Sequence, residues 1–183
     1  MLTWWRGRSK TGRTATNLYG SIVAAARREP FYVAYGVSDT PDGRFALLVA
    51  HMFLVMERLR GEDVDGQELS RALVETFVTD MDDSMREMGV GDLSVPKKVK
   101  KAAGALYDSV AAIRQVADEP EEILAGALRQ TLMQGETEPA ALAVAAYIRC
   151  AGTALGDLPL DELLAGRVKF ADVQSRKEGS HDD

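Results

Sequence analysis

Cysteine and histidine are scarce in this sequence. Cys150 is the single cysteine among 183 residues, which excludes an internal disulfide and fits a reducing compartment. It lies in an alanine-rich helical pattern, so we expect a packed thiol rather than a reactive one. Of the two histidines, His51 lies among apolar residues, where a hydrogen-bonded core histidine is typical. His181 has no partner in view.

Recognisable catalytic motifs are also missing. The sequence has no zinc-like cluster, no nucleophile elbow, no P-loop and no dinucleotide fingerprint. The Gly-Val-Gly-Asp-Leu-Ser stretch that begins at Gly89 is too short and too poorly spaced to cradle a phosphate. The residues therefore offer no persuasive active site, and we expect no catalytic residues and no bound metal or cofactor.

Long apolar runs and a broad excess of positive charge are absent as well. The longest apolar run, residues 45–56, is shorter than the roughly 20 residues that span a membrane, so we interpret it as a core helix. Residues 1–7 lack the apolar region and cleavage site of a signal peptide, and we expect none. The net charge of −6 argues against nucleic acid as the main partner. Basic residues do gather at two places, Arg6, Arg8, Lys10 and Arg13 near the start, and Lys97, Lys98, Lys100 and Lys101 farther along.

Helical spacing runs through almost the whole sequence, and strand alternation is nearly absent. The length suffices for one domain with a sizeable core. We predict an all-α fold, a single compact helical domain of about six or seven helices with a central apolar helix. We expect a basic N-terminal arm at residues 1–14, the helical domain at 15–173 and a disordered tail at 174–183.

Start and stop signals divide the helical part. Residues 41–60, which follow the expected N-cap Thr40, are apolar nearly all round, so this helix should be the central one. Residues 31–35 hold too many aromatic side chains for one helical stripe and form either an irregular connector or a short turn of helix. The other expected helices run from about 15 to 28 and 65 to 88, and open after Ser94, at Pro120, at Pro139 and near Leu160.

The turn after the third expected helix has a specific glycine pattern. Gly89 should stop that helix in the left-handed conformation, and Gly91 makes the connection a tight reversal. Ser94 can cap the helix that follows. At the other end of the third helix, Asp65 and Glu68 are spaced like a capping box.

Acidic residues concentrate near the end of the third helix. Asp80, Asp83 and Glu87 are spaced by three and four residues, so they project from one side. Asp80 falls inside the apolar stripe, where an unpaired carboxylate would cost several kcal/mol to bury. It must therefore be paired or hydrogen-bonded.

Two readings of these acids follow. One is a Mg²⁺ site for a diphosphate, because aspartate-rich helices of all-α prenyl-transferring enzymes resemble this run. Such enzymes need a second acidic motif and a longer chain, and neither is present. The favoured reading is ion pairing that locks two helices together, without a metal. The residues expected in this structural set are Arg44, Asp80, Asp83, Arg86, Glu87 and Asp92, with Arg58 and Lys97 as further candidate bases.

Methionine and tryptophan mark two candidate surfaces. Met85 and Met88 lie just before Gly89, and flexible thioethers suit surfaces that adapt to apolar partners. Trp4 and Trp5 lie beside arginines, a pairing favoured at membrane interfaces. The alternative for the tryptophans is a frayed arm or a side chain tucked onto the core.

Several blocks of the sequence carry a family resemblance. They are LYGSIVAAAR (18–27), FYVAYGVSDTPDGRF (31–45), HMFLVMERL (51–59), DMDDSMREMGVGDLSVPKKVKK (80–101) and LLAGRVKF (163–170). These blocks resemble the ubiquinol–cytochrome c chaperone family, which includes the mitochondrial cytochrome b assembly chaperone and its bacterial relatives. The chain departs from the family at Leu106-Tyr107-Asp108-Ser109, where relatives carry an aromatic-Tyr-Gly-Arg segment.

The resemblance implies an all-helical, non-enzymatic assembly factor. Family members look after newly made cytochrome b before the cytochrome bc complex is built. The mitochondrial relative works with a small partner protein near the ribosome exit, so a ribosome or a small partner protein is an expected contact. The lack of an amphipathic transit peptide fits a bacterial cytoplasmic member, which we expect near the inner face of the membrane.

We expect one client-binding surface at the turn and the aromatic segment. Covering about 400 Å² of apolar surface at ~25 cal/mol/Å² yields on the order of 10 kcal/mol. Association costs of roughly 4–15 kcal/mol offset most of it, so binding should be weak and reversible. Two lysines in this surface could meet acidic client loops or anionic lipid headgroups, or could simply be solvated. The expected residues are Phe31, Tyr32, Tyr35, Met85, Met88, Val90, Leu93, Val95, Lys97 and Lys98.

Overall fold

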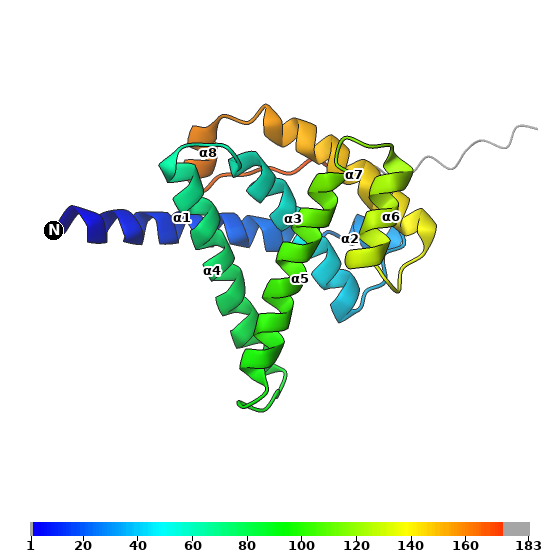
Figure 1. The fold of residues 1–183 in the computed structure, drawn as a ribbon, viewed down its shortest axis with the longest axis horizontal. Coiled ribbons are helices and arrows are strands. Elements are labelled where there is room, and N and C mark those ends of the chain that lie inside the picture. The colour runs from blue at the N-terminus through cyan, green and yellow to red at the C-terminus, as the bar shows by residue number, and fades with distance from the viewer. Residues whose placement is uncertain (1, 174–183) are drawn as a thin grey trace, which may run out of the picture.

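The computed structural model describes residues 2–173, with side chains described from Lys10 onward. Every regular element in this part of the chain is a helix, which confirms the predicted all-α class. Six helices have 11 residues or more, and two have five residues each. In order, the elements are α1 (Leu2–Ala26), α2 (Glu29–Val33), α3 (Pro41–Leu59), α4 (Val64–Glu87), α5 (Val95–Gln115), α6 (Glu121–Thr131), α7 (Glu138–Gly156) and α8 (Leu160–Leu164) (Figure 1).

Helix α3 is the central helix, as its apolar sequence predicted. It packs against α1, α4, α5 and α7, and every residue from Ala46 to Val55 is buried. The helix starts where the Thr40 hydroxyl accepts a hydrogen bond from the Gly43 backbone N–H at 3.1 Å. Pro41 follows as the first helical residue, where its missing N–H costs nothing.

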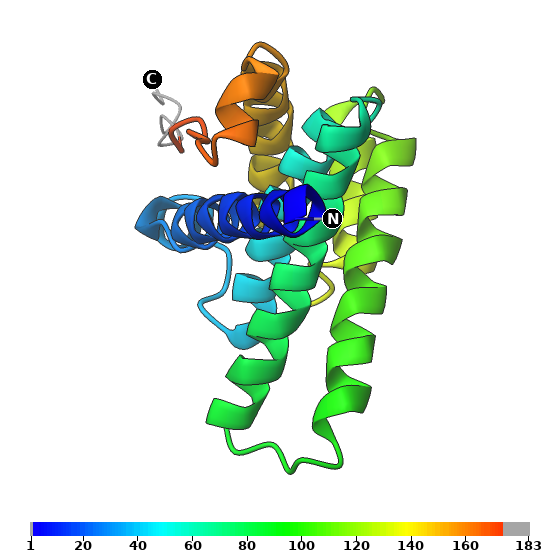
Figure 2. The same cartoon turned by 90° about the vertical axis from the view of Figure 1, so that its left-hand side faces the viewer.

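Helices α4 and α5 form an antiparallel hairpin that extends beyond the rest of the fold (Figures 1 and 2). Each helix has one buried face, which includes Phe77 on α4 and Leu106 on α5. Helix α4 ends at Glu87, and Gly89 adopts a left-handed φ of 76°, as predicted. Residues 88–94 then make the turn at the far end of the hairpin.

Helix α1 is longer than its apolar pattern indicated. It begins at Leu2 instead of near Ala15, so residues 2–14 are helical. From Lys10 onward, where its side chains are described, the first buried residue is Thr14, and Lys10 and Arg13 are exposed. The division into a basic arm and a helical domain stays a prediction. Of the two readings of residues 31–35, the structure bears out the short helical turn, because α2 runs through Val33.

One predicted helix cap is wrong, and a second is correct in its position only. The N-cap of α4 is Asp63, whose carboxylate accepts a hydrogen bond from the Gly66 N–H at 3.3 Å. The chain therefore enters α4 before the capping box placed on Asp65 and Glu68. Ser94 is the N-cap residue of α5, as predicted, but its side chain makes no capping hydrogen bond.

The last described residues close the fold. Arg28, between α1 and α2, donates hydrogen bonds to the carbonyl oxygens of Ala171 at 2.7 Å and of Phe170 at 3.5 Å. The Phe170 side chain is buried and meets the His51 ring of α3 with ring centroids 4.9 Å apart. The tail predicted at residues 174–183 lies outside the described residues.

Helix α7 is long and apolar enough, by length and composition, to cross a membrane. It packs against both α3 and α6, and Tyr147 and Ile148 are among its buried residues. These contacts are those of a core helix.

Candidate functional site

The hairpin tip, residues 85–95, holds half of the side chains predicted to bind a client. Leu93 is 100% exposed and Met88 is 69% exposed, whereas Met85 and Val90 are half-buried. Exposure of this kind costs free energy in water, because a buried leucine or methionine is stabilised by about 1.5–3 kcal/mol. Val95 is fully buried, so its assignment to an exposed client surface is wrong.

Backbone hydrogen bonds hold the shape of the tip. The Val90 N–H donates to the Met85 carbonyl at 3.0 Å, and the Ser94 N–H donates to the Gly91 carbonyl at 2.7 Å. The turn therefore presents Leu93 from an ordered backbone.

The aromatic segment does not provide the second half of that surface. Phe31 is fully buried, and its ring packs edge-to-face against the rings of Tyr35, His51 and Tyr147. Tyr32 is half-buried, and its hydroxyl donates to the Ala26 carbonyl at 3.0 Å. In Figure 1 this segment lies in the body, away from the end of the hairpin. Phe31 is a core residue, and the expected continuous surface is wrong.

His51 is a satisfied core residue, as predicted. Its Nδ1 lies 2.7 Å from the Leu47 carbonyl oxygen, which can only accept, so Nδ1 carries the proton. Its Nε2 then accepts from the Tyr147 hydroxyl at 2.9 Å. Burial lowers the pKa of His51 to about 4, and the charge of Arg28 acts in the same direction. The imidazole is therefore neutral near pH 7.

The partner of Asp80 is a tyrosine. Asp80 accepts a hydrogen bond from the Tyr19 hydroxyl at 2.8 Å, which joins α4 to α1. Burial, this hydrogen bond and the Asp80 charge raise the pKa of Tyr19. The prediction that Asp80 needs a partner is correct, but the arginine or lysine partner expected for it is wrong.

The other acids of the expected structural set pair only in part. Arg86 bridges Asp82 and Asp92, each at 2.6 Å, which ties the end of α4 to the turn. Among residues with described side chains, Asp83 and Glu87 form no ion pair. Arg44 instead pairs with Asp39 at 2.6 Å and lowers the pKa of that carboxyl.

No metal centre is found in the described part of the chain. No group of three or more His, Cys, Asp or Glu side chains there gathers closely enough to hold an ion. Cys150 is exposed on α7, so the expectation of a packed thiol is wrong. On this helix the buried face falls on Tyr147, Ile148 and Ala151, and Cys150 points away from it.

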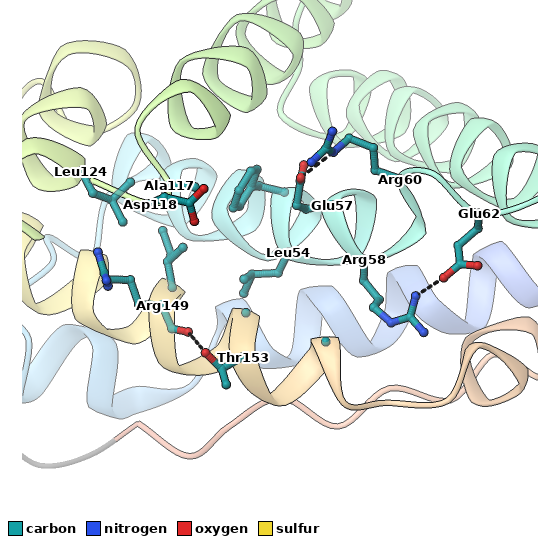
Figure 3. Close-up of a pocket in the computed structure, with 14 residues that line it drawn as sticks. Leu54, Glu57, Arg58, Arg60, Glu62, Ala117, Asp118, Leu124, Arg149 and Thr153 are labelled. Atoms are coloured by element: carbon teal, nitrogen blue, oxygen red, sulfur yellow. Dashed lines mark hydrogen bonds and ion pairs between the residues drawn. The ribbon is translucent and has the colours of Figure 1, made fainter. Parts of the chain in front are cut away.

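A cleft of about 630 Å³ between α3, α6, α7 and the segment that follows α5 was not predicted (Figure 3). Its apolar floor includes Phe53, Leu54 and Ile148, all nearly buried. Gly152 of α7 faces Leu54 of α3 here, and a Cβ built on Gly152 would lie 3.7 Å from Leu54 Cδ2, an ordinary contact. Sequence spacing gave no signal for this cleft, because it did not indicate which helices face one another.

Most charges at the rim of the cleft are already neutralised. Arg58 pairs with Glu62, and Arg60 and Arg114 both pair with Glu57. Figure 3 shows the Arg58–Glu62 and Arg60–Glu57 pairs along one side of the cleft. The cleft can hold an apolar side chain, but no serine or cysteine nucleophile is among its lining residues.

The lysines after the tip differ from these arginines. Lys97, Lys98, Lys100 and Lys101 are all exposed. None forms an ion pair with a described residue. These lysines provide unpaired positive charge beside the exposed apolar side chains of the hairpin tip.

The chain is similar to known proteins in sequence and in fold. Residues 33–170 match the model of a family described as ubiquinol–cytochrome C chaperone. The chain is similar to the crystal structure of the Cbp3 homolog from Brucella abortus, with 35% sequence identity and a TM-score of 0.80. That match covers 94% of this chain and 97% of the other. None of the curated proteins matches the chain.

Proposed function

This chain belongs to the ubiquinol–cytochrome c chaperone family, and we propose that it transiently binds newly made cytochrome b while the ubiquinol–cytochrome c reductase complex is assembled. It does so as a binding protein and catalyses no reaction. The observation that carries the proposal is the projecting hairpin tip, where Leu93 and Met88 are exposed. The family match includes this tip.

The tip suits a client that must be held and then released. It is apolar at Met88, Val90 and Leu93, and it is bordered by acids on α4 and lysines on α5. An apolar membrane segment gains by covering the exposed side chains. The area is small, so association costs offset most of the gain and the complex dissociates readily.

We further propose that the chaperone works on the cytoplasmic side, near the inner face of the membrane. A client that leaves a ribosome and enters a bilayer is accessible there between the two events. A ribosome or a small partner protein could share the client at that stage. The Mg²⁺-dependent prenyl-diphosphate enzyme, weighed from the aspartate run, has no support, because Asp80 is bonded to Tyr19 and no acidic cluster forms in the described residues.

Site-specific photo-crosslinking tests the client surface. A photo-reactive residue is placed at Met88, Val90 or Leu93 in the full chain, in cells that are synthesising cytochrome b. We expect cytochrome b to be captured from these positions, and capture to fall when translation is inhibited. Matched controls are Val64 and Ile123, which are 67% and 50% exposed but lie away from the tip.

The comparison with the control positions distinguishes a specific client surface from non-specific capture by any exposed apolar residue. Capture at the tip positions with little capture at the controls supports the proposal. Equal capture at Val64 and Ile123 would mean that any exposed apolar residue suffices. No capture of cytochrome b at any tip position contradicts the proposed surface, and unchanged cytochrome b spectra after deletion of the gene contradict the function.

A further inference from the structure

The first turns of α5 carry an exposed basic face. With each residue turned by about 100° from the last, Lys97, Lys100 and Lys101 fall within an arc of about 100°. The buried Val95 and Val99 fall on the opposite side of the helix. We name these three residues the lysine face, and Lys98 flanks it.

The lysine face is electrostatically unfavourable for the helix itself. The N-terminus of a helix is its positive end and favours acidic side chains. Here the first turn of α5 has no acid, and the first acidic residue of the helix is Asp108. The lysines also lack ion-pair partners among the described residues. Positive charge is thus concentrated where the fold gains nothing from it.

Nearby acids do not neutralise this face. Arg86 engages Asp82 and Asp92, while Asp83 and Glu87 are exposed on α4, the other leg of the hairpin. The two legs stand apart toward the tip in Figure 2. A partner that approaches along α5 therefore meets lysines first.

We propose that the lysine face docks this protein on an anionic lipid bilayer. The α4–α5 hairpin projects from the rest of the fold (Figures 1 and 2). It can therefore contact a flat surface without obstruction by the other helices. Leu93, fully exposed beside the lysines, gains by entering the headgroup boundary. An RNA backbone would attract the lysines equally but would offer nothing to Leu93. This docking does not depend on the client binding proposed above.

The docking should be weak and sensitive to salt. Each lysine close to an anionic surface strengthens binding about fivefold, so the three together supply on the order of 100-fold. The attraction falls off within about 10 Å at 0.1 M salt. Such contact is reversible, which suits a protein that returns for another client.

Vesicle co-sedimentation with the full purified chain tests the proposal. The probes are vesicles of phosphatidylcholine alone and vesicles of equal parts phosphatidylcholine and phosphatidylglycerol, at low and high salt. We expect binding to the anionic vesicles at low salt only. Replacing Lys97, Lys100 and Lys101 by Gln should lower that binding on the order of 100-fold, and replacing them by Arg should preserve it.

A control of equal charge identifies the surface. Arg71, Arg129 and Lys169 are exposed and form no ion pair within the described structure. Replacing these three by Gln should leave vesicle binding nearly unchanged, whereas L93S should weaken it severalfold.

Several results would overturn the docking. One is equal binding of the protein to neutral and to anionic vesicles. Another is an equal loss of vesicle binding in the two triple Gln variants. A third is unchanged vesicle binding of L93S together with tighter binding of the protein to RNA than to vesicles. Loss only when Arg6, Arg8, Lys10 and Arg13 are replaced by Gln would assign membrane contact to α1 instead. Crosslinking of cytochrome b is scored separately, so failure there removes the client proposal and leaves the vesicle result standing.

Discussion

At the scale of single residues, His51 is kept neutral by burial, with no acidic partner. The Leu47 carbonyl and the Tyr147 hydroxyl satisfy its two ring nitrogens. Phe31 and Phe170 pack edge-on against the ring. Protonation would place a cation in this apolar setting and would turn Nε2 into a second donor, which disrupts the bond from Tyr147.

The lowered pKa of His51 predicts that acid destabilises the fold. The pKa is about 4 in the folded chain against an ordinary value of 6.5. As the pH falls below 6.5, the unfolded chain takes up a proton that the folded chain does not, so the free energy of unfolding falls by up to about 1.4 kcal/mol per pH unit. Urea unfolding between pH 7 and pH 5 should show a loss of about 2 kcal/mol.

The H51Q variant provides the control for this titration. Glutamine keeps a donor and an acceptor but does not titrate in this range. The variant should be less stable than the wild type at pH 7 and should lack most of the slope between pH 6.5 and 5, where ordinary carboxylates remain ionised. An equal slope in both proteins would show that His51 is not its source.

Residue-scale predictions from sequence succeeded where the argument was local. The helical projection showed that Asp80 lies in the apolar stripe of α4 and needs a partner. Its partner, Tyr19, is 61 positions away on α1. Helical periodicity identifies which face of α4 is buried but contains no information about which helix covers it.

At the scale of elements, the α4–α5 hairpin was the best predicted part of the fold. Gly89, Gly91 and the change from acidic to basic sequence located the reversal, and α4 and α5 end and begin within a residue of expectation. The prediction of the surface was less complete. Val95 is buried as the first residue of α5, because the helix directs it toward the inside of the hairpin.

The two glycines of the turn, Gly89 and Gly91, should differ in how substitution by alanine changes the stability of the fold. Gly89 has a φ of 76°, a conformation that costs a residue with a Cβ about 1–2 kcal/mol. No atom lies within 4 Å of a Cβ built at Gly89, so the loss from G89A should be purely conformational. The free energy of unfolding, measured in urea, should fall by about 1 kcal/mol.

Gly91 in the same turn is the matched control. It does not have a positive φ, and a Cβ there would also meet no atom. The G91A variant should therefore be neutral or slightly more stable, since alanine reduces the entropy of the unfolded chain. A loss in G91A as large as that in G89A would contradict a role for the left-handed conformation.

At the scale of the whole molecule, segments that are far apart in the sequence pack together to form the cleft and to close the core. The cleft is built from α3, α6, α7 and the segment between α5 and α6, which come from separate parts of the chain. The segment after α8 returns to α3 and to Arg28. Neither arrangement could be predicted from the sequence, because both depend on how helices cross and not on where each helix begins and ends.

The returning segment makes the core depend on its last residues. Phe170 is 2% exposed and covers the His51 ring, so F170A would leave a cavity beside a buried polar group. Phenylalanine-to-alanine changes in a core cost about 3–5 kcal/mol, a large share of the 5–15 kcal/mol that stabilises a typical domain. Urea unfolding followed by circular dichroism should show this loss in one cooperative transition, because Phe170 touches the central helix.

The neighbouring K169A, at an exposed position, should lie within about 0.5 kcal/mol of the wild type. If F170A instead unfolds at the wild-type midpoint, the segment after α8 opens independently, and the stability of the body resides in the helices alone.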